Sequence, residues 1–386
     1  MKTIKTTQDL AVYCAYAAKF DFVTVDTEFL RERTYYSKLC LVQLAVPDDA
    51  EDAAVLVDPL VEGMDLAPLY ELFADQSITK VFHAARQDLE IFYIEGGVIP
   101  APLFDTQVAA MVCGFGEQVG YETLVRKIAR AQLDKSSRFT DWSRRPLSDA
   151  QQTYALADVT HLRDIYLNLS QQIKKSNRAP WVDEEMAVLR DPSTYVVNPD
   201  DAWQRVKTRT NSGKFLAVIQ ELARFREELA QSRNVPRNRI YKDDAMLELA
   251  STKPKTIADL GRSRLLLREA RKGDIADGIL KAVADGLSRD PKDHPKPKAD
   301  RTKLHVNPAL ADLLRVLLKA KSEETGVAQR MIASAAELDE ISAGARDVPA
   351  LGGWRLEVFG TDALRLCNGE IGLCAEKGKI KVVELN

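Results

Sequence analysis

The sequence predicts an α/β domain with a mixed sheet, followed by two all-α helical bundles. Apolar segments rich in β-branched residues come early in the chain, and segments with helical periodicity surround them. The first connections are too short for helices, which predicts an antiparallel meander flanked by helices. From about residue 203 the pattern is purely helical. Strands mixed with helices and then helices alone are typical of an α/β domain joined to helical modules.

Four short apolar runs define the expected sheet. The first begins at Asp21 with Phe-Val-Thr-Val, the second covers residues 38–46, and the third covers residues 53–57. Residues 79–83 predict a buried strand that follows a helix at 66–74.

Apolar residues at helical spacing predict the other helices. These helices are expected at residues 88–93, 103–113, 117–130, 149–175, 215–230 and 308–321. Ser148 is the expected N-cap of the long helix at 149–175, because its hydroxyl can accept a hydrogen bond from the first turn.

The chain divides into domains where its composition changes. The expected segments are an α/β domain at 1–202, a first helical domain at 203–290, a linker at 291–303, and a second helical domain with a C-terminal tail at 304–386. The linker is predicted from three prolines in a charged stretch. Residues 235–240 recur as residues 327–332, and this internal repeat indicates two related helical bundles.

Charge is distributed unevenly along the chain. The net charge is -11 over residues 1–202, +10 over residues 203–303, and -2 over residues 304–386. An acidic domain followed by a basic one suits a metal site coupled to a module that binds a polyanion. The positive excess favours nucleic acid as the partner, with a solvated helical surface as the alternative.

Acidic residues in three separate segments can build a metal site. Asp26 and Glu28 are two apart on a strand, so both side chains point to one face. Asp88, taken alone, is typical of a helix cap. Tyr154 and Asp158 are four apart on a helix and share one face, where the tyrosine is either a core residue or a group that orients a water molecule.

Four carboxylates without accompanying cysteine or histidine ligands indicate hard divalent cations. The preferred ions are Mg²⁺ or Mn²⁺ rather than Zn²⁺. Two such cations would stabilise the attacking and leaving oxygens of an in-line displacement, which implies phosphodiester hydrolysis. The sequence has no Gly-x4-Gly-Lys-Ser/Thr phosphate loop, so we expect no nucleotide cofactor.

The remaining composition favours a cytoplasmic protein. The five cysteines lack the spacing of a metal site or a disulfide framework and are expected to be reduced. We find no signal of basic, apolar and small residues at the start, and no apolar run approaches the length of a membrane span. We therefore expect no membrane partner.

Basic and aromatic residues before the long helix are candidates for substrate binding. Lys135, Arg138 and Arg145 can hold phosphates, or they can simply solvate a loop. Trp142 can stack on a base, although core packing is an equal alternative.

These motifs together resemble the DEDD exonucleases of the tyrosine-bearing subclass, and more closely the ribonuclease D family. The matching segments cover most of residues 20–170; besides Asp26 and Glu28 they include His83-x4-Asp88-Leu89-Glu90, Phe104-Asp105-Thr106-Gln107, Leu133-Asp134-Lys135-Ser136, Thr140-Asp141-Trp142, Arg145-Pro146-Leu147 and Tyr154-Ala155-x2-Asp158-Val159. Residues 211–290 resemble the HRDC domain of that family, and residues 304–375 resemble a second, diverged copy.

The resemblance implies a ribonuclease H-like fold and a 3′→5′ exoribonuclease. Such an enzyme trims RNA 3′ ends, tRNA precursors among them, and releases nucleoside 5′-monophosphates. By resemblance, Asp26, Glu28 and Asp158 would hold one metal, Asp26 would bridge to a second metal supported by Asp88, and Tyr154 would position the water.

Two further expectations complete the sequence-based account. We assign Phe29, His83, Arg237 and Arg239 to substrate binding, with His83 expected to support the site through hydrogen bonds rather than to bind a metal. The alternative functions are a DNA 3′→5′ exonuclease, which the absence of a following polymerase domain disfavours, and a non-catalytic RNA-binding adaptor on a nuclease scaffold.

Overall fold

The computed structural model describes residues 2–134, 136–138, 140–210, 212–296 and 305–385, so Lys135 and part of the predicted linker lie outside the described residues. The chain forms two compact units. The first unit comprises Met1–Glu28, Cys40–Thr194 and Lys303–Asn386. The second comprises Phe29–Leu39 and Tyr195–Thr302.

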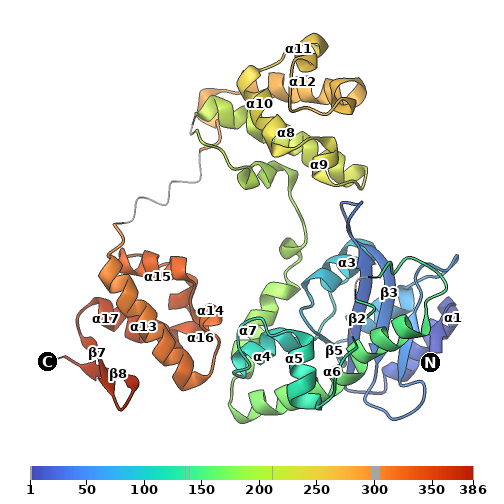
Figure 1. The fold of residues 1–386 in the computed structure, drawn as a ribbon, viewed down its shortest axis with the longest axis vertical. Helices are drawn as coiled ribbons and strands as arrows, with labels where there is room; N and C mark the ends of the chain where they lie inside the picture. Colours follow the sequence, from blue (N-terminus) through green and yellow to red (C-terminus); the bar gives the residue numbers. More distant parts are fainter. Residues whose placement is uncertain (1, 135, 139, 211, 297–304, 386) are drawn as a thin grey trace. The chain divides into compact units, whose positions relative to one another are not determined.

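A mixed six-stranded sheet with the strand order β1-β4-β3-β2-β5-β6 forms the centre of the nuclease-like part (Figure 1). The strands are β1 (Lys2–Ile4), β2 (Phe22–Leu30), β3 (Lys38–Ala45), β4 (Ala54–Val57), β5 (Thr79–Phe82) and β6 (Leu103–Asp105). β3 pairs antiparallel with β4, whereas β1 with β4, β2 with β5 and β5 with β6 are parallel pairs. The predicted mixed sheet is therefore confirmed.

Helices flank this sheet and bury its apolar side chains. They are α1 (Thr7–Ala17), α2 (Ala67–Ala74), α3 (Arg86–Gly96), α4 (Thr106–Val112), α5 (Tyr121–Leu124), α6 (Asp149–Lys175) and α7 (Ala179–Arg190). α6 contacts β4 and β5 and has the predicted bounds. Its cap is also as predicted: the Ser148 hydroxyl accepts a hydrogen bond from the backbone N–H of Gln151 at 3.2 Å.

Two predicted helices begin later than the sequence indicated. Residues 103–105 form the strand β6, and α4 follows because Asp105 caps it by accepting hydrogen bonds from two N–H groups of its first turn. Between residues 117 and 130 the helix begins only at Tyr121 and continues as a π-helix at Val125–Ala129. Three residues are too few for periodicity to distinguish a strand from a helix start.

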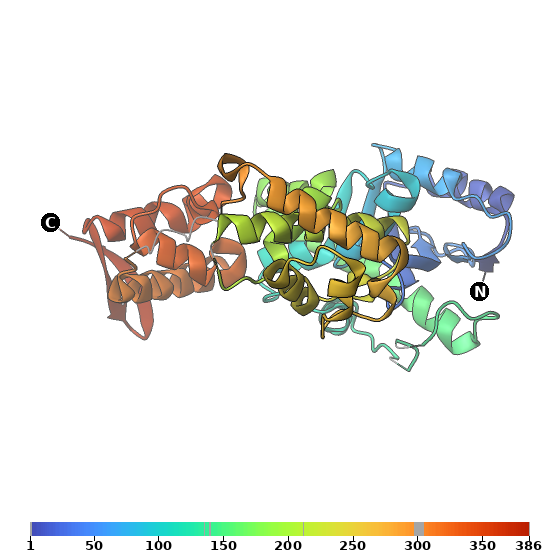
Figure 2. The same ribbon diagram turned by 90° about the horizontal axis from the view of Figure 1, so that it is seen from above.

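The second unit is built from helices around its own apolar core. They are α8 (Gly213–Ser232), α9 (Arg237–Ile240), α10 (Asp243–Thr252), α11 (Ile257–Gly261) and α12 (Gly273–Ser288). α8 and α12 pack along each other (Figures 1 and 2). The segment Phe29–Leu39 belongs to this unit because the Asn234 side-chain oxygen accepts hydrogen bonds from the N–H groups of Tyr35 and Tyr36, at 3.0 and 2.9 Å.

The C-terminal part repeats much of the order of elements seen in the second unit, without a counterpart of α11. Its helices are α13 (Pro308–Thr325), α14 (Gln329–Ile332), α15 (Ala335–Ser342), α16 (Gly353–Arg355) and α17 (Thr361–Cys367). The repeated sequence segments include α9 and α14, and each last helical stretch begins at a glycine with positive φ, Gly273 or Gly353. A hairpin of β7 (Ile371–Glu376) and β8 (Lys379–Glu384) follows, which the sequence analysis did not predict.

This C-terminal part packs on α4 and α7 of the first unit. The Trp181 and Trp354 rings stack at a centroid distance of 5.0 Å, and Trp354 donates a hydrogen bond to Glu185 at 3.0 Å. Arg178 donates to the carbonyls of Val112 and Thr325, at 2.7 and 2.5 Å. Among the described residues, no helix is both long and apolar enough to cross a membrane.

Candidate active site

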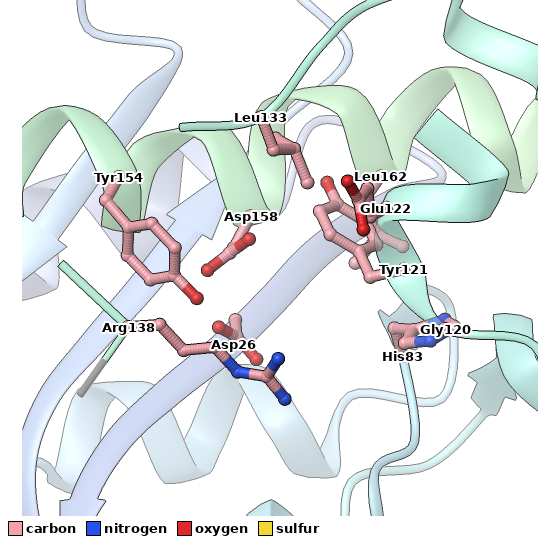
Figure 3. A pocket seen from close by; sticks show the side chains of 10 residues that line it. All are labelled: Asp26, His83, Gly120, Tyr121, Glu122, Leu133, Arg138, Tyr154, Asp158 and Leu162. Carbon is pink, nitrogen blue, oxygen red and sulfur yellow. The ribbon is translucent and has the colours of Figure 1, made fainter. Parts of the chain in front are cut away.

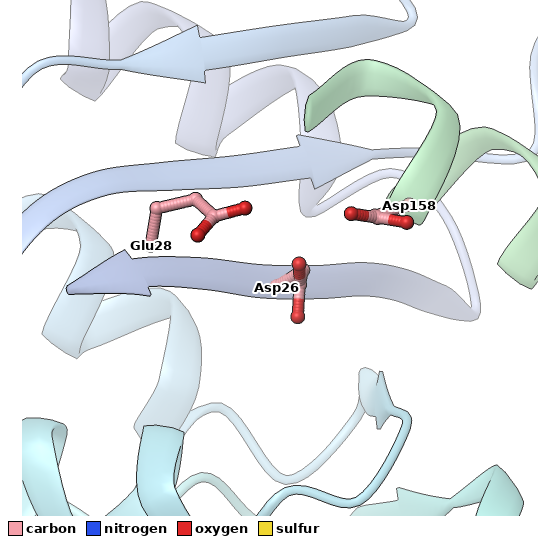
Figure 4. A group of neighbouring side chains, drawn as sticks. All are labelled: Asp26, Glu28 and Asp158. Carbon is pink, nitrogen blue, oxygen red and sulfur yellow. The ribbon is translucent and has the colours of Figure 1, made fainter. Parts of the chain in front are cut away.

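Three carboxylates from two elements converge beside the centre of the sheet. Asp26 and Glu28 lie on β2, and Asp158 lies on α6 (Figure 4). One carboxylate oxygen from each lies within 4.8 Å of the other two. The strand alternation that puts Asp26 and Glu28 on one face therefore directs both toward the same turn of α6.

Thr24 fixes the position of α6 relative to β2. Its hydroxyl lies 2.8 Å from the Val159 carbonyl of α6 and 3.1 Å from the Ala45 carbonyl of β3. Thr24 is completely buried. Because Thr24 is two residues before Asp26 and Val159 directly follows Asp158, this contact sets the distance between the two carboxylates.

Asp88 is the fourth carboxylate and has a different position. It lies in the first turn of α3, is buried, and accepts a hydrogen bond from the hydroxyl of Thr27, the residue between Asp26 and Glu28. Asp88 lies outside the group of three, but its charge helps to raise the pKa of Asp26. The structure thus brings together all four acids that the sequence singled out.

Burial disfavours the ionised form of all four acids, and repulsion by the other acids of the site adds to this effect for Asp26 and Glu28. Burial first, and then Asp158 and Asp88, raise the pKa of Glu28 to about 9. Burial raises the pKa of Asp88 to about 7 against the Thr27 hydrogen bond, and the pKa of Asp158 to about 7 against Tyr154 and Arg138. The pKa of Asp26 is raised well above its usual range by burial and by the other three carboxylates. Divalent cations would relieve this repulsion, and ligands that are all oxygen fit Mg²⁺ or Mn²⁺.

Tyr154 lies one helical turn before Asp158 and forms a hydrogen bond with its carboxylate. Burial and the neighbouring carboxylates raise the pKa of Tyr154, so the phenol stays protonated near neutral pH. The Trp142 ring supports the Tyr154 ring at a centroid distance of 6.0 Å. Tyr154 can therefore take part in hydrogen bonds but does not serve as a base.

An open pocket of about 280 Å³ lies next to these groups. Figure 3 shows Tyr154, Arg138, Asp26 and Asp158 on one side of it and His83 on the other. The other residues that line it are Gly120, Tyr121, Glu122, Leu133 and Leu162. The end of a nucleic-acid strand placed in this pocket would contact the carboxylates and the guanidinium group of Arg138.

His83 lines the pocket as a neutral imidazole. Burial lowers its pKa, against the opposing charge of Asp105. Its Nδ1 lies 3.0 Å from the Thr106 hydroxyl, and its ring lies 5.5 Å from that of Tyr121. The sequence-based expectation that His83 supports the site by hydrogen bonds agrees with this position.

Sequence reasoning missed three residues of the site. Thr24 and Thr27 position the acids, and Tyr121 forms part of the pocket wall, where its hydroxyl donates to the Ala157 carbonyl at 2.9 Å. Thr24 shares the face of Asp26 and Glu28 on β2, and Thr27 lies between the two acids, which was the available signal. The Tyr121 contact joins segments too distant in sequence for any local pattern to indicate.

Several predicted substrate contacts lie elsewhere in the fold. Arg145 binds the Asp58 carboxylate through two nitrogens, at 2.5 and 2.7 Å, and Trp142 is 2% exposed. In the second unit, Arg237 pairs with Glu227, whereas Arg239 is exposed. Phe29 directly follows Glu28 on β2 and is partly buried. Their assignment to RNA binding stays a prediction.

Comparisons with known proteins agree with this geometry. A family model described as 3′-5′ exonuclease matches residues 1–174, and an HRDC domain model matches residues 215–283. Ribonuclease D of Jannaschia sp. (strain CCS1) is 63% identical over 99% of both chains, and that of Nitrobacter hamburgensis is 49% identical over 100% of both. The crystal structure of Escherichia coli RNase D, an exoribonuclease involved in structured RNA processing, matches with a TM-score of 0.82 and 29% identity over 95% of this chain and 98% of that chain.

Proposed function

The chain belongs to the ribonuclease D family, and we propose that it is a metal-dependent 3′→5′ exoribonuclease that releases nucleoside 5′-monophosphates. The observation that carries this proposal is the group of Asp26, Glu28 and Asp158, whose oxygens lie within 4.8 Å of one another beside an open pocket. Such a cluster is destabilised without cations and has ligands suited to hard ones.

The four acids divide into two roles toward the metals. Asp26, Glu28 and Asp158 would hold one divalent cation, Mg²⁺ or Mn²⁺. Asp26 would also reach a second cation, which Asp88 supports from its place beside Thr27. When bound, the two cations stabilise the charge that develops on the attacking and leaving oxygens of the phosphodiester.

Tyr154 orients the attacking water in this proposal. Its hydroxyl hydrogen is used in the bond to Asp158, so the phenol oxygen is left to accept a hydrogen bond from the water. Because its pKa is raised, Tyr154 keeps its proton throughout. The water's own proton therefore has to leave toward a carboxylate or solvent.

The pocket beside the acids would hold the last nucleotides of the RNA. Arg138 lies close enough to lower the pKa of Asp158, and the same charge would attract a phosphate. His83 is neutral and can hydrogen-bond without adding charge. We infer that the substrates are RNAs with a short single-stranded 3′ end, tRNA precursors among them.

We propose that the chain has two HRDC-like domains and that the first of them binds RNA. The net charge of +7 over residues 203–290 supports that role. The shared order of elements from α8 to α12 and from α13 to α17 supports a second copy within residues 304–386. We place the enzyme in the cytoplasm, in keeping with its reduced cysteines.

Matched RNA and DNA oligonucleotides with a 5′ label test the proposed function. With Mg²⁺ or Mn²⁺, RNA should shorten in single-nucleotide steps, and a chelator should stop the reaction. Faster shortening of DNA would identify a DNA exonuclease. Binding of RNA with no metal-dependent cleavage would identify an adaptor instead.

A further inference from the structure

The second unit contains a cavity with a positive lining. It has a volume of about 350 Å³ and lies where α8, α9 and the start of α10 meet. The charged residues that line it are Arg205, Arg226, Arg237, Lys242, Glu227 and Asp243. Four cations against two carboxylates leave a net charge of +2 on the wall.

The two carboxylates of the cavity already have partners within the protein. Glu227 is 1% exposed and accepts hydrogen bonds from Arg237, through Nη2 at 2.7 Å and through Nε, and from the hydroxyl of Tyr35. Asp243 accepts a hydrogen bond from Arg226 Nη1 at 2.7 Å. The remaining cations of the wall are Arg205, whose charge helps to lower the pKa of Glu227, and Lys242, and both are exposed.

Arg226 has a buried donor without an acceptor. The residue is 6% exposed, and among the described residues its Nε has no hydrogen-bond partner, although Nη1 also donates to the Tyr241 carbonyl at 3.1 Å. An unsatisfied buried donor costs about 1–3 kcal/mol.

We propose that this cavity binds a phosphate group of the RNA backbone and so anchors the substrate at a fixed point on the first helical domain. The inference rests on the proposed function and assigns RNA binding to a specific place on the first helical domain. Guanidinium groups present N–H donors that match phosphate oxygens, and Lys242 adds a point charge at the rim. The cavity wall offers three cationic side chains besides Arg237, which is held by Glu227.

The test compares two double variants that remove the same charge. Arg205→Ala with Lys242→Ala removes the two exposed cations of the cavity. Lys255→Ala with Arg262→Ala removes two exposed cations of the same unit that do not line it. RNA affinity is measured in a chelator, so that no cleavage occurs, over a series of salt concentrations.

The cavity variant should bind RNA roughly tenfold more weakly and show a salt slope lower by about one, whereas the control variant should match the wild type. Equal weakening of both variants, or no weakening of the cavity variant, would overturn the proposal. Competition with adenosine 5′-monophosphate separates the two sources of phosphate: the nucleotide should displace little RNA from either protein, and strong displacement from the wild type alone would mean that the cavity takes free product instead.

Cleavage of a short oligonucleotide with Mg²⁺ separates this proposal from the proposed function. Both double variants should cleave it at the wild-type rate, because neither change touches the carboxylate site. A wild-type protein that does not cleave RNA would refute the exoribonuclease. A cleaving enzyme whose cavity variant binds RNA normally would refute the phosphate cavity alone.

Discussion

The two pockets of this molecule are lined by charges of opposite sign and therefore suit ligands of opposite charge. The pocket beside β2 collects carboxylates whose pKa values are raised by burial and repulsion, so it requires cations. The cavity beside α8 keeps a net positive wall and a buried arginine donor, so it requires an anion. The comparison supports our proposal that catalysis and RNA binding are separated into different units, each with a pocket whose net charge is opposite to that of its proposed ligand.

The largest expected effect comes from the acidic pocket. Asp26→Asn should lower the RNA cleavage rate by on the order of 10³-fold, because it removes a ligand shared by both proposed cations. RNA affinity in a chelator should stay the same or increase, since a negative charge is lost beside the phosphates. Asp49→Asn, an exposed acid of the same domain, is the control for the cleavage assay. A large loss of RNA affinity would break the separation between the two pockets.

The C-terminal helices α13 to α17 belong to the first unit, which also holds the acidic pocket. Trp354→Ala should lower the free energy of unfolding of the first unit by about 3 kcal/mol, because Trp354 is 4% exposed, stacks on Trp181 and donates to Glu185. Leu313→Ala, at a side chain that is 45% exposed, should have little effect in the same denaturant titration. Weaker RNA binding without a loss of stability would assign this copy to the grip instead.

A substitution at Tyr154 distinguishes the positioning of the water from the binding of RNA in the acidic pocket. Tyr154→Phe should lower the cleavage rate at saturating RNA by about 10- to 100-fold while leaving RNA affinity unchanged, because only the hydroxyl is lost. Tyr166→Phe on the same helix is the matched control, since that ring packs against Phe22 and Phe104 and does not line the pocket. An unchanged rate in Tyr154→Phe would remove the residue from the mechanism.

The smallest effect concerns stability without metal. Carboxyl groups that titrate near 4 in the unfolded chain have pKa values of about 7 to 9 in the fold, so the folded state binds more protons between these limits. The stability of the metal-free protein should therefore fall as pH rises from about 5 to 9, by a few degrees in the melting temperature. Saturating Mg²⁺ should reverse the trend. A pH-independent melting temperature in a chelator would show that the pKa values of the four acids are not raised in the folded protein.

The parts of this account that were predictable from sequence are those with local patterns. The periodicity over α6 and the cap at Ser148 fixed that helix, and the spacing of Asp26 and Glu28 indicated a shared face. Resemblance then added Asp88 and assigned the role of Tyr154. Contacts between distant segments were out of reach.

The docking of Tyr35 beside Asn234 and Glu227 illustrates the limit. Tyr35 is about 200 positions from Asn234 and Glu227 in the sequence. The short segment Phe29–Leu39, which carries Tyr35, lies between two segments of the first unit in the sequence but belongs to the second unit. Arg237 was assigned to RNA binding because its partner could not be identified from sequence: Glu227 is a buried acid of the amphipathic helix α8.

One measurement tests most directly whether catalysis and RNA binding are separated. RNA affinity and single-turnover cleavage rate are determined on one 5′-labelled RNA for Asp26→Asn and for the Arg205→Ala, Lys242→Ala double variant. The account predicts that the first variant loses the rate and keeps the affinity, whereas the second loses affinity and keeps the rate at saturating RNA. If either variant loses both quantities, the two pockets do not divide the work in this way.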